Sequence, residues 1–250
     1  MLSILLLAAN VSLVSAKAAI MNADYRGDLA KLAAVRAELA PLRDDPEVGY
    51  LADYWSGYAS HRIAINGANG GMSPADMKVH LDRAAADYES SFRKKPDFAD
   101  AIAGAALVHG WLAYPAFHPD DPGAAKVHLE SGARLQKKAE ELEPSNPRVM
   151  WVKGAFYLYS PPESGGSREK AMEIYRKQAE VSGPPQPDSP LPDWGKAEAL
   201  MSLAFAHTMG NAPDLEAAMR DAHAALKVQP EWRYVREVLV PMIEKRRATP

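Results

Sequence analysis

The segment Leu142-Glu143-Pro144-Ser145-Asn146-Pro147 separates two alanine-rich amphipathic stretches, and it has two counterparts in the chain. These are Lys94-Lys95-Pro96-Asp97 and Val228-Gln229-Pro230-Glu231. Pro96 and Pro144 are 48 residues apart, and Pro144 and Pro230 are 86 apart, which is two steps of 43. Because proline ends a helix, this recurrence predicts a stack of helical hairpins. Stacks of this kind usually bind other molecules rather than catalyse reactions.

Ten segments have the apolar spacing of helices, and none has that of a strand. The first spans residues 24–42, the last spans 232–246, and the eight between them form pairs at 47–95, 97–143, 147–182 and 193–229. We predict an all-α fold, a right-handed superhelical stack of about four hairpins. Residues 17–46 and 231–250 would cap its two ends, and the hairpins would occupy residues 47–230.

The first sixteen residues, MLSILLLAANVSLVSA, are mostly apolar. Their length suits the core of a signal peptide, and Val14-Ser15-Ala16 offers a site for cleavage, although no Lys or Arg precedes the apolar run. We predict export, to a bacterial periplasm, and no stable membrane span, because the stretch is too short to cross a bilayer comfortably. The alternative is a buried first helix in a cytoplasmic protein.

Composition removes several classes of function. The chain has 250 residues, a formal net charge of -3 and no cysteine. The charge gives no general attraction for nucleic acid or an anionic membrane. The lack of cysteine excludes disulfides, thiolate nucleophiles and zinc–thiolate centres.

The second helix of each predicted pair resembles the corresponding helix of a tetratricopeptide repeat. In that family a small residue is followed by a large one four positions later, a small one three further on, and then a proline. Ala84, Tyr88, Ser91 and Pro96 have this pattern. Gly132, Gln136, Ala139 and Pro144 have it with a polar residue in the large position, and Ala218, Ala222, Ala225 and Pro230 have a small one there. In a first helix, Gly154 and Tyr157 match the small and aromatic positions.

The chain departs from the family in length, because its repeats exceed the usual thirty-four residues and carry inserted loops. The insertion 159–167, with its Gly165-Gly166 pair, and the later Asp193-Trp194-Gly195 resemble features of divergent tetratricopeptide proteins of the bacterial envelope. The chain is also similar to the tetratricopeptide partner of periplasmic tripartite transporters. The resemblance implies a concave wall of first helices that binds a protein, a peptide or a small ligand.

The aromatic residues concentrate in the predicted first helices, where such a wall would form. Aromatic rings with polar tips suit the capture of peptides and small molecules, although about half of these rings are expected to pack in the core. Histidine, arginine and lysine side chains nearby are candidates for polar contacts. The predicted groove residues are Tyr54, Tyr58, His61, Arg62, Trp111, Lys153 and Tyr157.

No catalytic or metal-binding pattern accompanies these residues. None of the seven histidines is paired at the spacing of a helical zinc site, and we expect no metal and no cofactor. Gly165-Gly166-Ser167 precedes a helix and could hold an anion, but a tight turn is the simpler explanation.

The sequence therefore predicts a non-enzymatic binding module with a concave helical face. One alternative is an assembly protein of an envelope complex that acts through its inserted loops, including the proline-rich stretch 184–192. A second is an enzyme with a groove histidine, His61 or His109. Protein, peptide and small-molecule ligands all remain open.

Overall fold

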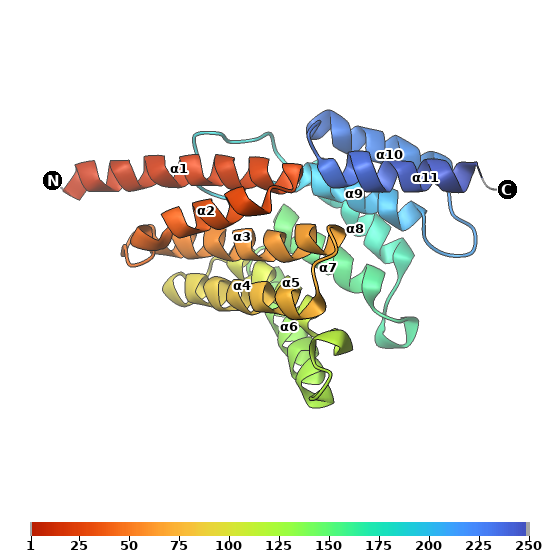
Figure 1. Cartoon of the computed structure of the whole chain (residues 1–250), viewed down its shortest axis with the longest axis horizontal. Helices are drawn as coiled ribbons and strands as arrows, with labels where there is room; N and C mark the ends of the chain where they lie inside the picture. Colours follow the sequence, from red (N-terminus) through yellow and green to blue (C-terminus); the bar gives the residue numbers. More distant parts are fainter. Residues whose placement is uncertain (1, 249–250) are drawn as a thin grey trace. The chain divides into compact units, whose positions relative to one another are not determined.

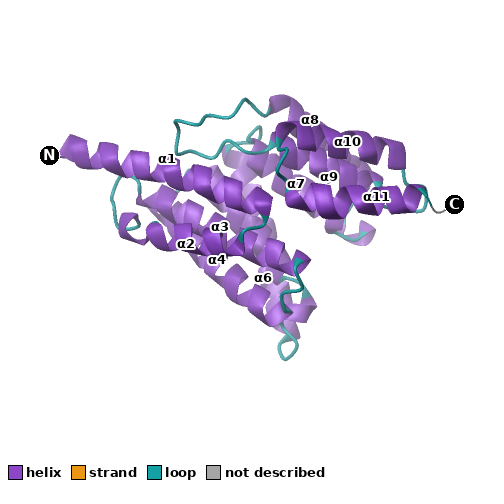
Figure 2. Cartoon of the chain, turned by 45° about the horizontal axis from the view of Figure 1, so that its top comes forward, coloured by secondary structure: helices purple, strands orange, loops and turns teal. Residues whose placement is uncertain are grey.

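The computed structural model describes residues 2–248, and this part of the chain contains helices and loops but no strand (Figures 1 and 2). The α-helices are α1 (Leu2–Arg26), α2 (Leu29–Glu38), α3 (Gly49–Asn69), α4 (Pro74–Lys94), α5 (Ala99–Leu112), α6 (Pro122–Leu142), α7 (Pro147–Tyr159), α8 (Arg168–Val181), α9 (Lys196–His207), α10 (Leu215–Val228) and α11 (Val240–Arg247). Short turns of 3₁₀-helix lie at η1 (Ala40–Leu42), η2 (Pro115–Phe117) and η3 (Pro162–Ser164), and η4 (Val235–Leu239) is π-helical. The fold is all-α, as predicted. None of the described helices has both the length and the apolar character to cross a membrane.

The helix ends follow local sequence signals. Side-chain oxygens of polar residues accept backbone N–H groups at the starts of six helices: Asp28, Ser73, Asp121, Asn146, Ser167 and Asp214. Helices α4, α6 and α10 each end two residues before the proline of the corresponding corner, Pro96, Pro144 or Pro230. The predicted partners α3 and α4, α5 and α6, α7 and α8, and α9 and α10 each pack against one another.

The N-terminal segment differs from the single helix expected before the first pair. Helix α1 continues to Arg26, Gly27 turns the chain with a φ of 66°, and Asp28 caps the separate helix α2. Glycine adopts this left-handed conformation without steric cost, so the break follows from Gly27 itself. Helix α1 runs through the expected cleavage point after Ala16 and buries both Leu13 and Ala16. The signal peptide over residues 1–16 stays a prediction.

The C-terminal helix also differs from the regular helix expected over residues 232–246. Two α-helical residues, 233 and 234, precede the π-helical turn η4, and the chain becomes α-helical again at Val240, one residue before Pro241. A proline ring clashes with the carbonyl four residues earlier in a regular helix, and a wider turn relieves this clash. Residues 249 and 250 of the predicted C-terminal tail lie outside the described residues.

The chain divides into two compact units, which we describe separately. Unit 1 contains the residues up to Glu143 together with Gln186–Pro192, and unit 2 contains Pro144–Pro185 with the residues from Asp193 onward. In unit 1, the ring of Tyr88 on α4 lies against two glycines of neighbouring helices. A Cβ atom on Gly104 would lie 2.6 Å from this ring, and one on Gly57 would lie 3.1 Å from it. The small residues thus make room for the large one and allow the helices to approach closely.

Buried charges join the helices of unit 1. The carboxylate of Asp53 is fully buried and accepts hydrogen bonds from Arg43 Nε at 2.5 Å, Lys94 Nζ at 2.5 Å and Ser90 Oγ at 2.7 Å. Arg43 also pairs with Asp87 on α4, at 2.6 Å. The network ties the segment after η1 to α3 and α4, and it satisfies a carboxylate that would otherwise be costly to bury.

The residues Gln186–Pro192, which we call the proline strap, form part of unit 1 although they connect α8 to α9. Lys17 Nζ donates to the carbonyl oxygens of Gln186 and Ser189, both at 3.0 Å, and Trp55 Nε1 donates to that of Pro190 at 2.8 Å. The strap has no helix, as its proline content predicts. Its carbonyls are held by side chains of α1 and α3.

Unit 2 has its own core between α7, α8 and α9. The buried members are Leu158, Ala171, Met172, Tyr175, Leu203 and Ala206. A Cβ atom on Gly154 would lie 2.4 Å from the ring of Tyr175, which repeats in unit 2 the contact between glycine and tyrosine seen in unit 1. At the turn before α8, Gly165 has a φ of 87° and Ser167 caps the helix. The glycine pair therefore makes a tight turn, which was the simpler of the two explanations.

Candidate ligand-binding surface

Three predicted groove residues of α3 lie in the interior of unit 1. The exposed fractions of Tyr54, Tyr58 and His61 are 1%, 4% and 3%. The rings of Tyr54 and Tyr58 lie 6.5 Å apart, in an aromatic cluster that also includes Trp55. These side chains offer a ligand almost no surface, so the structure makes them packing residues rather than an open groove wall.

The chain's own α1 covers this face of α3. The buried carboxylate of Asp24 on α1 accepts hydrogen bonds from Tyr58 Oη at 2.8 Å, Arg62 Nε at 2.6 Å and Asn66 Nδ2 at 2.9 Å. These three donors follow one another at four-residue spacing along α3, which places them on one side of the helix. The predicted groove residue Arg62 is therefore engaged by an internal carboxylate.

His61 has the environment of a core residue. Burial, and then the positive charge of Arg62, lower the pKa of His61 to about 3. The imidazole is therefore neutral at physiological pH, and its Nε2 atom has no hydrogen-bond partner among the described residues. A substrate would have no access to this ring as a general base.

The other three predicted residues are more accessible, and they are divided between the two units. Trp111 is 37% exposed near the end of α5, in unit 1. Lys153 and Tyr157 are half-buried on α7, in unit 2. Lys170 Nζ lies 5.6 Å from the centre of the Tyr157 ring, within the range of a cation–π contact. The structure thus groups four predicted residues on α3 and two on α7.

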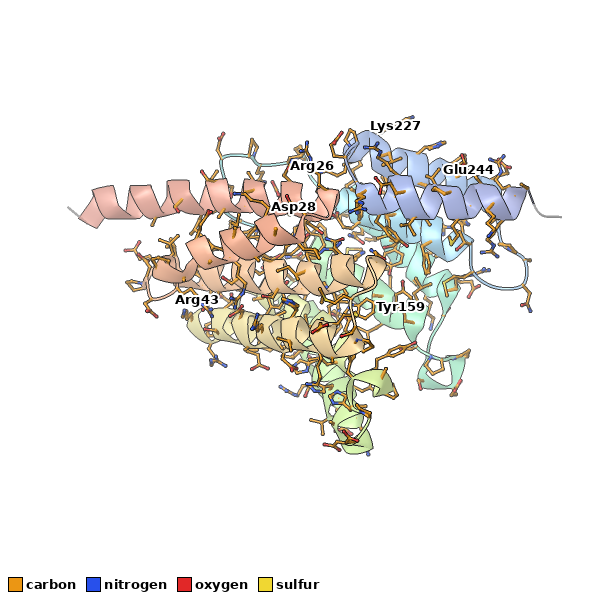
Figure 3. The ribbon with its side chains drawn as sticks, in the orientation of Figure 1. Arg26, Asp28, Arg43, Tyr159, Lys227 and Glu244 are labelled. Carbon is orange, nitrogen blue, oxygen red and sulfur yellow. The ribbon has the colours of Figure 1, made fainter. Side chains whose placement is uncertain are left out.

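A half-open aromatic layer covers the core of unit 2. We call Trp151, Tyr157, Tyr159, Phe205 and Met209 the α7–α9 surface. Trp151, Tyr157, Phe205 and Met209 are partly buried and pack on the core. Tyr159, which is labelled in Figure 3, is 65% exposed. Its ring lies 6.3 Å from that of Phe205. The layer belongs to two first helices, α7 and α9, which contact each other.

Hydrogen bonding and ring packing hold this surface in place. Trp151 Nε1 donates to Ser202 Oγ on α9 at 2.9 Å, and its ring meets that of Trp194 edge-on at 5.5 Å. An aromatic side chain whose polar atom is already bonded presents an apolar face in a fixed orientation. The arrangement can therefore bind an apolar or aromatic ligand with little loss of side-chain freedom.

Sequence reasoning did not select Phe205 and Met209. Phe205 lies on α9 and Met209 follows the end of this helix, and with Met201 they have a four-residue spacing that could have indicated one face of a first helix. The pattern was weak because α9 carries only one aromatic residue and matches the repeat family poorly. No group of three or more described His, Asp or Glu side chains is arranged to hold a metal ion.

Comparisons with known proteins show a likeness of fold to a solved structure. No family model matches the chain, and no curated protein matches it significantly in sequence. Among solved structures, it is similar to the HusA haemophore from Porphyromonas gingivalis, with a TM-score of 0.54 and 19% identity. The likeness covers 76% of this chain and 92% of that one. At this level of identity it concerns the fold alone, an all-helical fold shared with a binding protein of a bacterium.

Proposed function

We propose that this protein is an exported, non-enzymatic binding module that captures a flat, largely apolar small molecule on the α7–α9 surface. The observation that carries the proposal is the exposure of Tyr159 beside Phe205, on a layer of partly open aromatic residues. A large tyrosine side chain left 65% exposed gains little from folding, whereas a ligand could cover it.

The arrangement of the helices supports this reading. In a tetratricopeptide-like stack, adjacent first helices form the concave wall, and α7 and α9 are adjacent first helices of unit 2. The contacts of Gly104 with Tyr88 and of Gly154 with Tyr175 have the small-against-large packing of that family. We therefore propose a divergent tetratricopeptide-like architecture, with the α7–α9 surface as part of its wall.

The structural neighbour suggests the class of ligand to test first. HusA is a haemophore, and haem is a flat, mostly apolar molecule of the kind that stacks on aromatic rings. A peptide with aromatic anchors would use the same rings and is the alternative ligand. The inserted loops are less favoured as the active element, because the proline strap is tied to Lys17 and Trp55.

The test compares two tyrosines that are equally exposed, Tyr159 in unit 2 and Tyr114 in unit 1, both at 65%. Haemin is titrated into the wild type and into the Tyr159→Ala and Tyr114→Ala variants, and the shift of its Soret band is followed. Loss of one aromatic contact of about 1.4 kcal/mol would weaken binding about tenfold in Tyr159→Ala. Tyr114→Ala should bind like the wild type.

A second probe separates the ligand class from the surface itself. The fluorescent apolar dye 1-anilinonaphthalene-8-sulfonate is titrated into the same three proteins. If the dye binds in a Tyr159-dependent manner but haemin does not bind, the surface holds a different apolar ligand. If neither probe depends on Tyr159, the proposed role of the α7–α9 surface is wrong.

A further inference from the structure

Three histidines meet where α5, its connection to α6, and α6 come together in unit 1. His109 Nδ1 on α5 and His128 Nδ1 on α6 are 2.8 Å apart, a hydrogen-bond distance. The ring of His118, just after η2, stacks on that of His128, with centres 5.2 Å apart and planes inclined by 24°. His109, His118 and His128 are called the histidine cluster below.

The outer partners of the rings determine where the protons lie. His118 Nε2 is 2.7 Å from the carbonyl oxygen of Leu112, which only accepts, so this nitrogen carries a proton. His109 Nε2 faces Glu89 Oε1 at 3.4 Å and carries a proton for the same reason. In a neutral ring the other nitrogen then accepts, so His128 Nδ1 donates its proton to His109 Nδ1.

The first half of α6 has few other interior contacts. None of its described residues from 123 to 131 is buried, whereas Gly132, Leu135, Gln136 and Ala139 in the second half are. Val127 and Leu129 are 62% and 53% exposed. Little apolar burial therefore holds residues 123–131 in place, and the bond from His128 to His109 adds a polar contact to α5.

We propose that the histidine cluster is a proton-operated latch that holds the first half of α6 on α5 at neutral pH and releases it in mild acid. One added proton can be tolerated, because a His128 ring that is also protonated at Nε2 still donates from Nδ1 to His109 Nδ1. A second proton leaves N–H groups on both facing nitrogens and two positive rings with centres 5.1 Å apart. The hydrogen bond is then lost and the rings repel.

The charged groups around the cluster offset this repulsion only in part. On α4, Glu89 faces His109 and is also within 3.8 Å of Arg93. Asp82 and Lys78, also on α4, act on His128 with opposite sign, and they are paired with each other at 2.8 Å. One available carboxylate therefore faces a cluster that can acquire three positive charges.

The direction of the effect follows from linkage. Burial, and then the neighbouring His109 and His118, lower the pKa of His128 below its ordinary value of 6.5. In the released state His128 regains that ordinary pKa and binds protons more readily. The latched state is therefore fully favoured above pH 6.5. Below pH 6.5, the ratio of latched to released protein falls by up to about tenfold per pH unit for each extra proton that the released state binds.

Hydrogen exchange measured by mass spectrometry tests the latch in the intact protein. Protection factors, which are corrected for the intrinsic effect of pH on exchange, are compared for residues 123–131 and 132–142 between pH 7.5 and 5. In the wild type, the protection of 123–131 should fall at least tenfold while that of 132–142 changes much less. Amides of α3 report any global loss of stability in acid. Buried His61, whose pKa is lowered, also makes the folded protein less stable as the pH falls.

Two variants complete the test. His128→Gln keeps a hydrogen-bonding side chain that does not titrate, so the protection of residues 123–131 should lose its pH dependence. His223→Gln, at an exposed position of α10, should behave like the wild type. A wild-type chain in which both halves of α6 respond equally to acid would overturn the proposal, as would a folded His128→Gln variant with unchanged pH dependence.

An NMR titration of the wild-type histidine rings needs no variant, and independent single-step titration of His109 and His128 would also contradict the latch.

Discussion

Replacing Asp24 by asparagine should destabilise unit 1 substantially, because this residue is the buried counter-charge that joins α1 to α3. Its exposed fraction is 2%, and that of the Arg62 side chain is 12%. Asparagine preserves the shape but removes the negative charge 2.6 Å from Arg62 Nε. Breaking a buried ion pair from one side costs about 3–5 kcal/mol, and the slight exposure of Arg62 places the expected loss near the lower limit.

The expected loss of about 3 kcal/mol corresponds to a decrease in melting temperature of roughly 6–12 °C for a protein of this size. Because the chain has two compact units, calorimetry and urea denaturation should resolve whether one transition moves or both do. Asp82→Asn is the matched control. It breaks the Lys78–Asp82 pair, which is similarly short but exposed, and should change the stability by less than about 1 kcal/mol.

A double-mutant cycle shows whether charge pairing is the cause. The variant Asp24→Asn/Arg62→Met removes both charges. Its loss in the free energy of unfolding should therefore be smaller than the sum of the two single losses, by at least about 1 kcal/mol. If the losses are additive, or if Asp24→Asn destabilises no more than Asp82→Asn, α1 is not held to α3 by this ion pair. The face of α3 would then be less firmly closed than the structure indicates.

Two further predictions concern the packing of unit 1. Gly104→Ala should destabilise the protein by about 1–3 kcal/mol in urea denaturation, despite the higher helix propensity of alanine, because the new Cβ atom would lie 2.6 Å from the Tyr88 ring. Gly183→Ala, which meets no atom within 4 Å, should cost much less, and equal losses would argue against the contact with Tyr88. Lys17→Met removes both hydrogen bonds from α1 to the proline strap, so limited proteolysis should cut the strap several times faster than in the wild type. An unchanged cleavage rate would mean that the hydrogen bonds from Lys17 do not hold the strap in place.

Local sequence signals were sufficient for most helix boundaries. Ser73, Asn146 and Ser167 cap helices through bonds to residues two or three positions away, and the proline corners end helices for reasons internal to the chain. The same kind of reasoning missed the break at Gly27, because the apolar spacing on either side of it is continuous enough to resemble one helix. Gly27 and the capping residue Asp28 are the local signals that could have placed the break.

Local sequence signals did not predict which aromatic side chains of the first helices are buried and which are exposed. Tyr58 and Tyr159 are both tyrosines of first helices, and their neighbouring residues do not distinguish a buried ring from an exposed one. Tyr58 is buried because α1 covers it, and its hydroxyl group donates to Asp24, which lies 34 residues earlier on α1. Tyr159 remains 65% exposed beside Phe205, which comes from α9. His109 and His128 likewise meet only because α5 and α6 pack together.

By itself, the sequence determined the all-helical class, the positions of the corners and the pairing of consecutive helices, since these depend on residues within a few turns of one another. Tertiary structure alone decided which aromatic residues are covered, which histidines form a hydrogen bond with each other and where the proline strap lies. These outcomes depend on contacts between residues far apart in the chain, and apolar spacing along a helix indicates that a face will be covered without indicating which segment will cover it.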